Sequence, residues 1–420
     1  MVGAAVAAAL SANRMTSQLR VALVDRQAPA STFKPPPVPE LRVSTVTPAT
    51  IDVLRRIGAW EDLQPPRSAA FATMQVWDYG GNSFVRYNAA DAGADTLGHV
   101  VENNVLLVAL LRLLRPPHAN VDTFWPASVR SLKLPDYSKA AGWNPLAEVQ
   151  LDSGQTLHAR LVVGADGGRS HIRSLAGLRT TGWSYNQRGV VGTVRTQTPN
   201  QVAWQRFLPS GPLALLPVRD GYSNVVWSTT PQHARQLEAA SPAGFAAAVN
   251  EALSGGPRPA QSSLVTSLLS SQPRPDATFL EPPTVEEAPG PSARSFPLTL
   301  CHAGRYVRPR LALVGDAAHA IHPLAGQGVN LGFGDVQALV DTLADAVSCG
   351  TDLGDILLLE GQYERPRQRA NTAMMAAIDS LKHVFTPQSG PLASLRGLGL
   401  DVVNLTPAVK GRILSYAMGA

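Results

Sequence analysis

The chain has 420 residues, of which 45% are hydrophobic and 16% are charged, and 36 lysines and arginines face 31 aspartates and glutamates. This length allows two or three domains, and so small a positive excess does not predict nucleic-acid binding. Two cysteines are too few for a disulfide scaffold or a four-cysteine zinc site, and no apolar run reaches the ~20 residues of a membrane helix.

The first half of the chain alternates helical and extended patterns. The continuous apolar run Leu19–Asp25 is typical of a strand buried on both faces of a parallel sheet. The other predicted elements are a helix over 1–13, a proline-rich loop over 33–39, a helix over 48–58, a hairpin of 74–79 and 83–87, and a leucine-rich helix over 104–114.

Further along, the chain contains two more apolar runs of this kind, Leu161–Gly164 and Arg310–Val314, which predict two further buried strands. Between them lie short runs separated by glycine, proline and aspartate, which predict an antiparallel sheet from 190–195, 202–208, 214–218 and 224–229. Residues 256–293 are low in complexity and predict a surface insertion, 328–347 a long helix, and the remainder more helix.

These patterns predict an α/β protein with a Rossmann-like parallel sheet, an inserted antiparallel sheet and C-terminal helices. The domain boundaries follow from where the patterns change. We expect a discontinuous nucleotide-binding domain (1–80, 95–185 and 303–348), a substrate domain (186–302) and a helical region (349–420).

The start of the chain resembles the end of a dinucleotide-binding motif. In G-x-G-x-x-G, the third glycine lets a helix pack closely on the sheet, and an acidic residue about 20 positions later binds a ribose. Gly3 and Asp25 fit these two places, so the first strand and the first two glycines would be missing. By itself this pattern is common in helices that precede a strand.

Two further aspartates follow predicted strands. Asp166 comes after Leu161–Gly164, and Asp316 comes after Arg310–Val314. Carboxylates at the carboxyl ends of parallel strands face the ligand crevice, but aspartate at such a place also caps the helix that follows. Three such aspartates, with Asp25, favour a ligand site.

The segment His319–Asn330 combines histidine, proline and closely spaced glycines before a predicted helix. Gly326 and Gly328 let backbone N–H groups approach a ligand, and a helix start attracts electron-rich groups. His319 and His322 have no third partner at a spacing suited to a metal, so we predict no metal site.

In their order along the chain, these segments resemble those of the flavin-dependent aromatic hydroxylases, the group of para-hydroxybenzoate hydroxylase. The resemblance is carried by the tail of the glycine motif, D-G-x-x-S-x-x-R at 166–173 and G-D-x-x-H-x-x-x-P-x-x-G-Q-G-x-N at 315–330. Within the group, the chain looks most like the mitochondrial monooxygenases of ubiquinone biosynthesis, through segments such as 74–78, 100–105, 202–217, 306–310 and 322–335.

This resemblance implies FAD as the cofactor and hydroxylation of an aromatic ring with O2. It implies Asp25 at the adenosine ribose, Arg42 at the pyrophosphate and Asp316 at the ribityl chain. Asp166 would serve FAD and nicotinamide binding. The loop residues Gly326, Gln327, Gly328 and Asn330 would lie against the flavin ring. Gly3, through its close packing in the glycine motif, and Pro323 are the other implied cofactor residues. No catalytic residue is implied.

The resemblance also implies the surroundings of the protein. The substrate would be a polyprenylated 4-hydroxybenzoate-type ring, and a ferredoxin-type protein would supply electrons. The chain would work in the multiprotein complex of ubiquinone biosynthesis, peripherally on the matrix side of the mitochondrial inner membrane. The alternative is a non-catalytic, N-terminally truncated family member that acts only within that complex.

Overall fold

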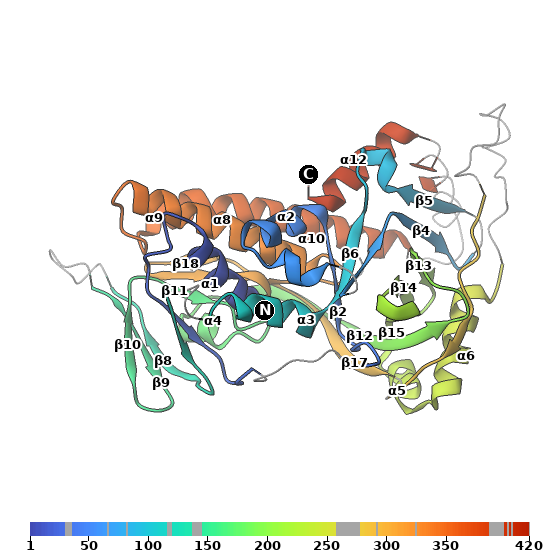
Figure 1. The fold of residues 1–420 in the computed structure, drawn as a ribbon, viewed down its shortest axis with the longest axis horizontal. Helices are drawn as coiled ribbons and strands as arrows, with labels where there is room; N and C mark the ends of the chain where they lie inside the picture. Colours follow the sequence, from blue (N-terminus) through green and yellow to red (C-terminus); the bar gives the residue numbers. More distant parts are fainter. Residues whose placement is uncertain are drawn as a thin grey trace.

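The computed structural model describes residues 1–29, 36–64, 67–80, 83–115, 120–136, 145–257, 278–290, 293–323, 326–385, 399–400, 403–404 and 406–419. The molecule is elongated, with a helix-covered half around the N-terminus and a second half built on a large sheet (Figure 1). In the described part of the chain, no helix combines the length and the apolar character needed to cross a bilayer.

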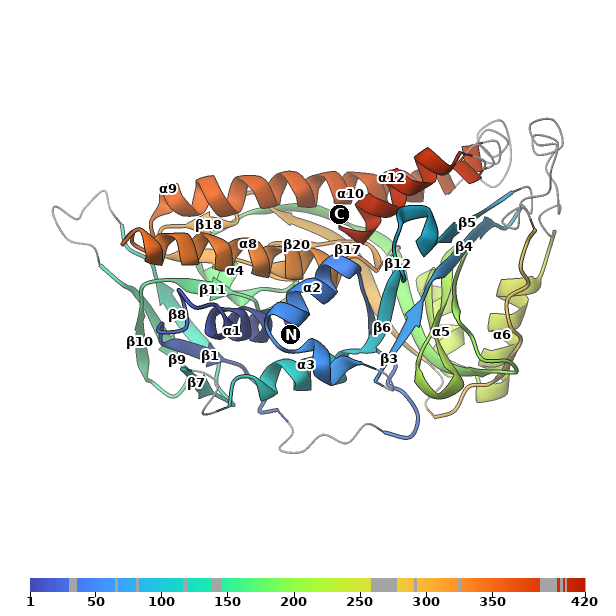
Figure 2. The ribbon, with the colours of Figure 1, turned by 45° about the horizontal axis from the view of Figure 1, so that its top comes forward.

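The predicted parallel strands form, but in two separate pairs. Strand β1 (Val21–Val24) pairs in parallel with β7 (Val121–Phe124), and β11 (Val162–Gly164) pairs in parallel with β19 (Leu311–Leu313). Among the described residues, no strand pairing joins the two pairs. Helix α1 (Val2–Ala12) lies between β1 and the long helix α8 (Gly328–Ser348) (Figure 2).

The burial of these strands differs from the prediction. Strand β19 is fully buried, as expected. Strands β1 and β11, expected to be buried on both faces, are only partly buried, and Ala22 is exposed. The prediction of buried strands at 19–25 and 161–164 was therefore wrong in burial. Within the described residues, each of the two has a parallel partner on one edge only.

Helices cover the half of the molecule around the N-terminus. Capping residues fix where these helices begin, and their apolar faces pack on the strands. Thr47 accepts a hydrogen bond from the Thr50 N–H and Pro48 takes the first turn, so a helix begins there. Leu313, Phe333 and the alanines of α1 belong to one large buried cluster. The other covering elements are α2 (Pro48–Arg56), η1 (Trp60–Leu63), α3 (Asn103–Arg112), α4 (His171–Leu175) and η5 (Gly315–Ala317).

Two small antiparallel sheets and one short hairpin accompany this half, and the sequence patterns did not reveal them. One small sheet, of β2, β6 and β3, runs between the two halves of the molecule (Figure 1). The bounds are β2 (Val43–Val46), β3 (Ser68–Phe71), β6 (Gly98–Glu102), β8 (Val129–Lys133), β9 (Ala147–Leu151), β10 (Thr156–Ala159) and β18 (Val307–Arg308).

The second half contains the predicted antiparallel sheet in an extended form. Its strands are β4 (Thr73–Asp78), β5 (Phe84–Asn88), β12 (Thr180–Thr196), β13 (Val202–Leu208), β14 (Gly211–Pro217), β15 (Tyr222–Thr229), β16 (Val285–Glu287), β17 (Arg294–Ala303) and β20 (His319–Ala320). Short turns η2 (Ala89–Ala92) and η3 (Arg219–Gly221) flank it.

Two details of this sheet differ from the expectation, whereas the described part of the predicted loop at 33–39 agrees with it. The predicted hairpin of β4 and β5 forms, but β4 pairs in parallel with β13, so it belongs to the large sheet although it falls within 1–80. The segment 256–293 contributes β16, which pairs with β12; residues 258–277, 291 and 292 of that segment lie outside the described residues. Of the loop at 33–39, residues 36–39 are described and contain no helix or strand.

Different helices cover the two faces of the large sheet. Helices α5 (Pro231–Ala239) and α6 (Pro242–Ser254) pack on one face, where Trp204, Leu213 and Leu215 meet Phe245 and Val249. Residues of the C-terminal helices pack on the other face. These helices are α10 (Arg365–Phe385) and α12 (Pro407–Met418). The short helix α9 (Ile356–Leu358) and the π-helix η7 (Leu359–Glu364) instead pack in the cluster that contains Leu313 and Phe333. All four form in the region that was predicted to be helical.

Candidate functional site

The ends of β1 and β19 and the start of α1 bring three predicted residues together, Asp25, Arg42 and Asp316. Asp25 directly follows β1, and Asp316 lies in the turn after β19. The α-amino group of Met1 lies within electrostatic reach of Asp25, Arg42 and Asp316. Val2 packs so closely on this turn that a Cβ at Gly315 would lie 3.2 Å from a Val2 methyl group. The start of α1, Asp25, Arg42 and Asp316 therefore surround one place.

The charged groups around this place suit a ligand that combines an anionic group with the hydroxyl groups of a ribose or another polyol. Burial lowers the pKa of the Met1 amine, although Asp25 and Asp316 act to raise it. Asp316 is accessible to solvent but enclosed on most sides, so desolvation raises its pKa, against the effects of His319, Arg42 and the amine. The N–H groups at the start of α1 add a positive helix end.

Asp166 lies just after β11, and its carboxylate already has hydrogen-bond partners within the protein. Its carboxylate accepts hydrogen bonds from the Ser170 hydroxyl, the His171 N–H at 2.6 Å and the Ile172 N–H at 3.1 Å. It therefore caps the start of α4, the alternative that the sequence left open. Its role toward FAD and nicotinamide stays a prediction.

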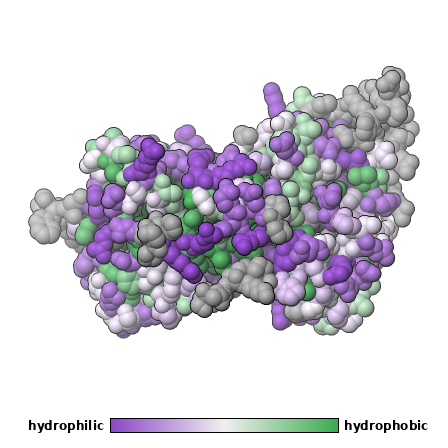
Figure 3. Space-filling model, in the orientation of Figure 1, coloured by the Kyte–Doolittle hydropathy of each residue, from purple (hydrophilic) through white to green (hydrophobic). Residues whose placement is uncertain are grey.

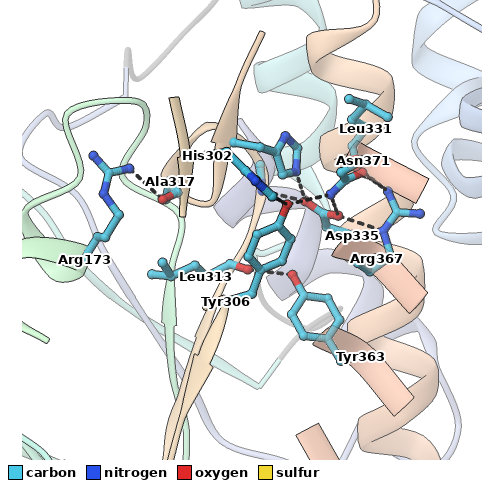
Figure 4. Close-up of polar contacts among 12 residues, drawn as sticks. Arg173, His302, Tyr306, Leu313, Ala317, Leu331, Asp335, Tyr363, Arg367 and Asn371 are labelled. Carbon is cyan, nitrogen blue, oxygen red and sulfur yellow. Dashed lines mark hydrogen bonds and ion pairs between the residues drawn. The ribbon is translucent and has the colours of Figure 1, made fainter. Parts of the chain in front are cut away.

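Arg173, the last residue of the motif at 166–173, connects the segment after β11 to the turn after β19. Its guanidinium donates to the carbonyl of Ala317 at 2.7 Å (Figure 4). It also donates to the carbonyl of Gly168 at 2.8 Å. The side chain is 9% exposed, so the contacts are largely shielded from water. Arg173 thus fixes the turn that carries Asp316, a role that the sequence analysis missed although the motif contains this arginine.

Asn330 holds the glycine loop against β2 and α2. Its Oδ1 accepts from the Thr50 hydroxyl at 2.7 Å and the Thr47 N–H at 3.1 Å, and its Nδ2 donates to the Thr45 carbonyl at 2.9 Å. Both ends of the amide have protein partners, so Asn330 shapes the loop. Gly326 has φ of +61°, a conformation that favours glycine, and a Cβ there would lie 3.5 Å from Thr45.

The rest of the loop lies between α8 and the C-terminal helix. The Gly326 N–H donates to the Pro323 carbonyl at 3.0 Å, and the Gln327 Nε2 donates to the Ala417 carbonyl of α12 at 3.1 Å. Gly328 is the first residue of α8. Leu324 and Ala325, between Pro323 and Gly326, lie outside the described residues.

The residues present fit FAD. An anionic diphosphate matches the start of α1 with Arg42, and hydroxyl groups match the accessible carboxylates of Asp25 and Asp316. His319 is 1% exposed, and its Nδ1 has no hydrogen-bond partner among the described residues. A buried polar atom of this kind is expected beside a ligand. Apolar side chains also show in the middle of this face, near α1 and α3 (Figure 3).

Comparison with known proteins agrees with this reading over almost the whole chain. The family model described as "FAD binding domain" matches residues 1–268 and 285–377. The ubiquinone biosynthesis monooxygenase COQ6, mitochondrial, of Xenopus tropicalis is 39% identical over 99% of this chain and 91% of its own length. The chain belongs to the ubiquinone-biosynthesis family of FAD-dependent monooxygenases.

More distant relatives lie in the same family and fold. The 3-demethoxyubiquinol 3-hydroxylase of Escherichia coli is 33% identical, over 100% of this chain and 96% of its length. The crystal structure of p-nitrophenol 4-monooxygenase from Pseudomonas putida superposes with a TM-score of 0.71 at 19% identity, covering 98% and 94% of the two chains. That likeness establishes the fold. The family relationships establish an FAD-dependent aromatic monooxygenase, as the motifs implied.

Proposed function

We propose that this chain hydroxylates the aromatic ring of a polyprenylated 4-hydroxybenzoate-type intermediate of ubiquinone biosynthesis, using O2. The two named relatives of ubiquinone biosynthesis support the pathway. The observation that supports the substrate class is the apolar face of the large sheet that adjoins the glycine loop, and we place a long apolar tail between this face and the C-terminal helices.

Alternate residues of β13 and β14 point to opposite faces. Trp204 and Leu215 point to the face on which side chains of α5 and α6 pack. Ala203 and Leu216 point to the other face, toward α12. That face adjoins the loop, since Gln327 bonds to Ala417 of the same helix. A prenyl tail bound along it would place its ring at the loop.

The chain's own residues would bind the ring and exclude water from it, while FAD, when bound, supplies the redox chemistry that activates O2. Tyr87 contributes to the apolar clusters on this face. Burial raises the pKa of Tyr87 to about 12, so its hydroxyl stays protonated at neutral pH and can donate a hydrogen bond. Tyr87 is a candidate for orienting an oxygen substituent of the ring.

Tail length provides the test of this substrate class. Burying a tail contributes ~0.8 kcal/mol per CH2, so affinity for ring compounds should rise steeply with each prenyl unit until the face is filled. We expect Leu216→Asp to remove this dependence, and Leu357→Asp, at a residue that is 76% exposed on α9, to leave it intact. Fluorescence titration of the purified protein measures both. Equal affinity for compounds with and without tails would refute the proposal.

We further propose that the chain works in mitochondria, on the matrix side of the inner membrane, with α12 against the bilayer. Val409, Ile413 and Tyr416 are 40%, 41% and 47% exposed, and their spacing places them on one stripe of α12 beside the exposed Arg412. In sedimentation with vesicles containing anionic lipid, Ile413→Ser with Tyr416→Ser should lower binding, and Leu357→Ser should not. Unchanged binding of the double variant would exclude this stripe.

A further inference from the structure

A single buried carboxylate lies beneath the turn that carries Asp316. Asp335, on α8, has an exposed fraction of 0% and accepts four hydrogen bonds (Figure 4). The donors are the Gly315 N–H at 2.8 Å, His319 Nε2 at 2.6 Å, Arg367 Nε at 2.8 Å and Asn371 Nδ2 at 3.1 Å. A carboxylate that is shielded from solvent needs such donors.

The two oxygens of Asp335 serve different parts of the fold. Oδ2 accepts from Gly315 and His319, which flank the turn that carries Asp316. Oδ1 accepts from Arg367 and Asn371, both on α10. One carboxylate therefore joins the turn after β19 to α10. Its Oδ2 side faces the proposed cofactor site, and its Oδ1 side faces the helical scaffold.

The α10 side of this junction is firmly held. Arg367 also donates to the Leu331 carbonyl at 3.1 Å and to Asn371 Oδ1 at 2.9 Å. The Asn371 amide lies 3.4 Å from the Tyr306 hydroxyl, which lies 2.9 Å from His302 Nε2. The Tyr363 hydroxyl donates to the Leu313 carbonyl of β19 at 2.6 Å. These contacts fix the carboxylate's position independently of any ligand (Figure 4).

We propose that Asp335 is a positioning residue for FAD: through Oδ2 it orients the Gly315–Ala317 turn and the His319 ring, and so aims Asp316 and His319 at the cofactor. This inference rests on the proposed placement of FAD at the turn. In this arrangement His319 Nδ1 faces the cofactor; this atom is buried without a partner among the described residues. Arg173, which holds Ala317, completes the frame of the turn from the opposite side.

The decisive variant is Asp335→Asn, which keeps the shape of the side chain but replaces one acceptor oxygen with a donor. Whichever way the amide turns, a donor then faces either Gly315 N–H and His319 or Arg367 and Asn371. We expect FAD affinity at least tenfold weaker than in the wild type. We also expect a shifted reduction potential for the FAD that remains bound, because the His319 ring loses the carboxylate oxygen that orients it. His319→Gln should weaken binding similarly with Asp335 intact.

Two controls separate positioning from general stability. Arg367→Gln removes a partner of Oδ1 only, so it should lower the melting temperature of the FAD-free protein and leave FAD affinity within about threefold of the wild type. Asp345→Asn changes an exposed aspartate on the same helix and should alter neither quantity. FAD affinity follows from flavin fluorescence, stability from thermal unfolding without FAD, and the potential from dye-coupled reduction.

Three results would contradict the inference or the placement on which it rests. If Asp335→Asn, or His319→Gln where the first variant does not fold, binds FAD with wild-type affinity and potential, the inference is wrong. It is also wrong if Arg367→Gln loses as much FAD as Asp335→Asn at an equal loss of stability. Asp316→Ala, measured in parallel, reports on the placement itself: if that variant keeps its FAD, the placement fails and the inference falls with it.

Discussion

An added N-terminal strand should stabilise this protein and increase its FAD affinity. We expect that effect from an extension of five β-branched residues followed by a G-x-G turn that leads into Gly3. The reason lies in the parallel sheet, where β1 and β11 are partly exposed and, among the described residues, unjoined. A strand between them would bury four or five apolar side chains, which contributes roughly 6–15 kcal/mol before the entropy of ordering.

The turn of the extension matters as much as its strand. Its N–H groups would add to the helix start that faces Arg42 and Asp316, where we place the diphosphate. Urea unfolding and FAD titration of the chain with and without the extension measure both effects. An extension of equal length rich in glycine and serine is the control. If the chain without an extension unfolds cooperatively and carries one FAD per protein, and the strand adds nothing, our interpretation of Gly3 and of the sheet fails.

Replacing Asp316 with alanine should release most of the bound FAD. Hydrogen bonds from ligand hydroxyls to a carboxylate contribute about 1.5–3 kcal/mol, which corresponds to roughly a tenfold to hundredfold loss of affinity. Asp316 lies in a turn held by Arg173 and Asp335, so the backbone should keep its shape in the variant. Absorbance of the dialysed protein measures the FAD that remains, with Asp345→Ala as the control. Yellow protein at native stoichiometry would refute the placement.

The sequence predicted those parts of the fold that depend on local patterns. The helix over 328–347, the buried strand at 310–314 and the antiparallel strands between 190 and 229 all form, because continuous apolar runs and glycine or proline punctuation mark them directly. The parallel pairing of β4 with β13 joins segments that are distant in the chain. No local pattern predicts such a contact.

The residues of the candidate site could likewise be predicted only in part from the sequence. Asp166 and Asp316 follow similar apolar strands, and only the structure distinguishes Asp166, which caps α4, from Asp316, which lies beside the start of α1. Asp335 could have been singled out from the sequence, since a lone aspartate in an otherwise apolar helix start suggests a buried charge. Its partners Arg367 and Asn371 could not, because they lie more than 30 residues further along the chain.

The most direct test of the proposed function is to follow oxygen from O2 into the ring. The purified protein is loaded with FAD, reduced through a ferredoxin and its reductase, and given a prenylated 4-hydroxybenzoate under oxygen-18 gas. Our account predicts a ring-hydroxylated product that contains one labelled oxygen atom, and no product from the Asp316→Ala variant. Oxidation of the reduced, FAD-loaded protein without any labelled ring product would contradict it and would favour a non-catalytic member of the biosynthetic complex.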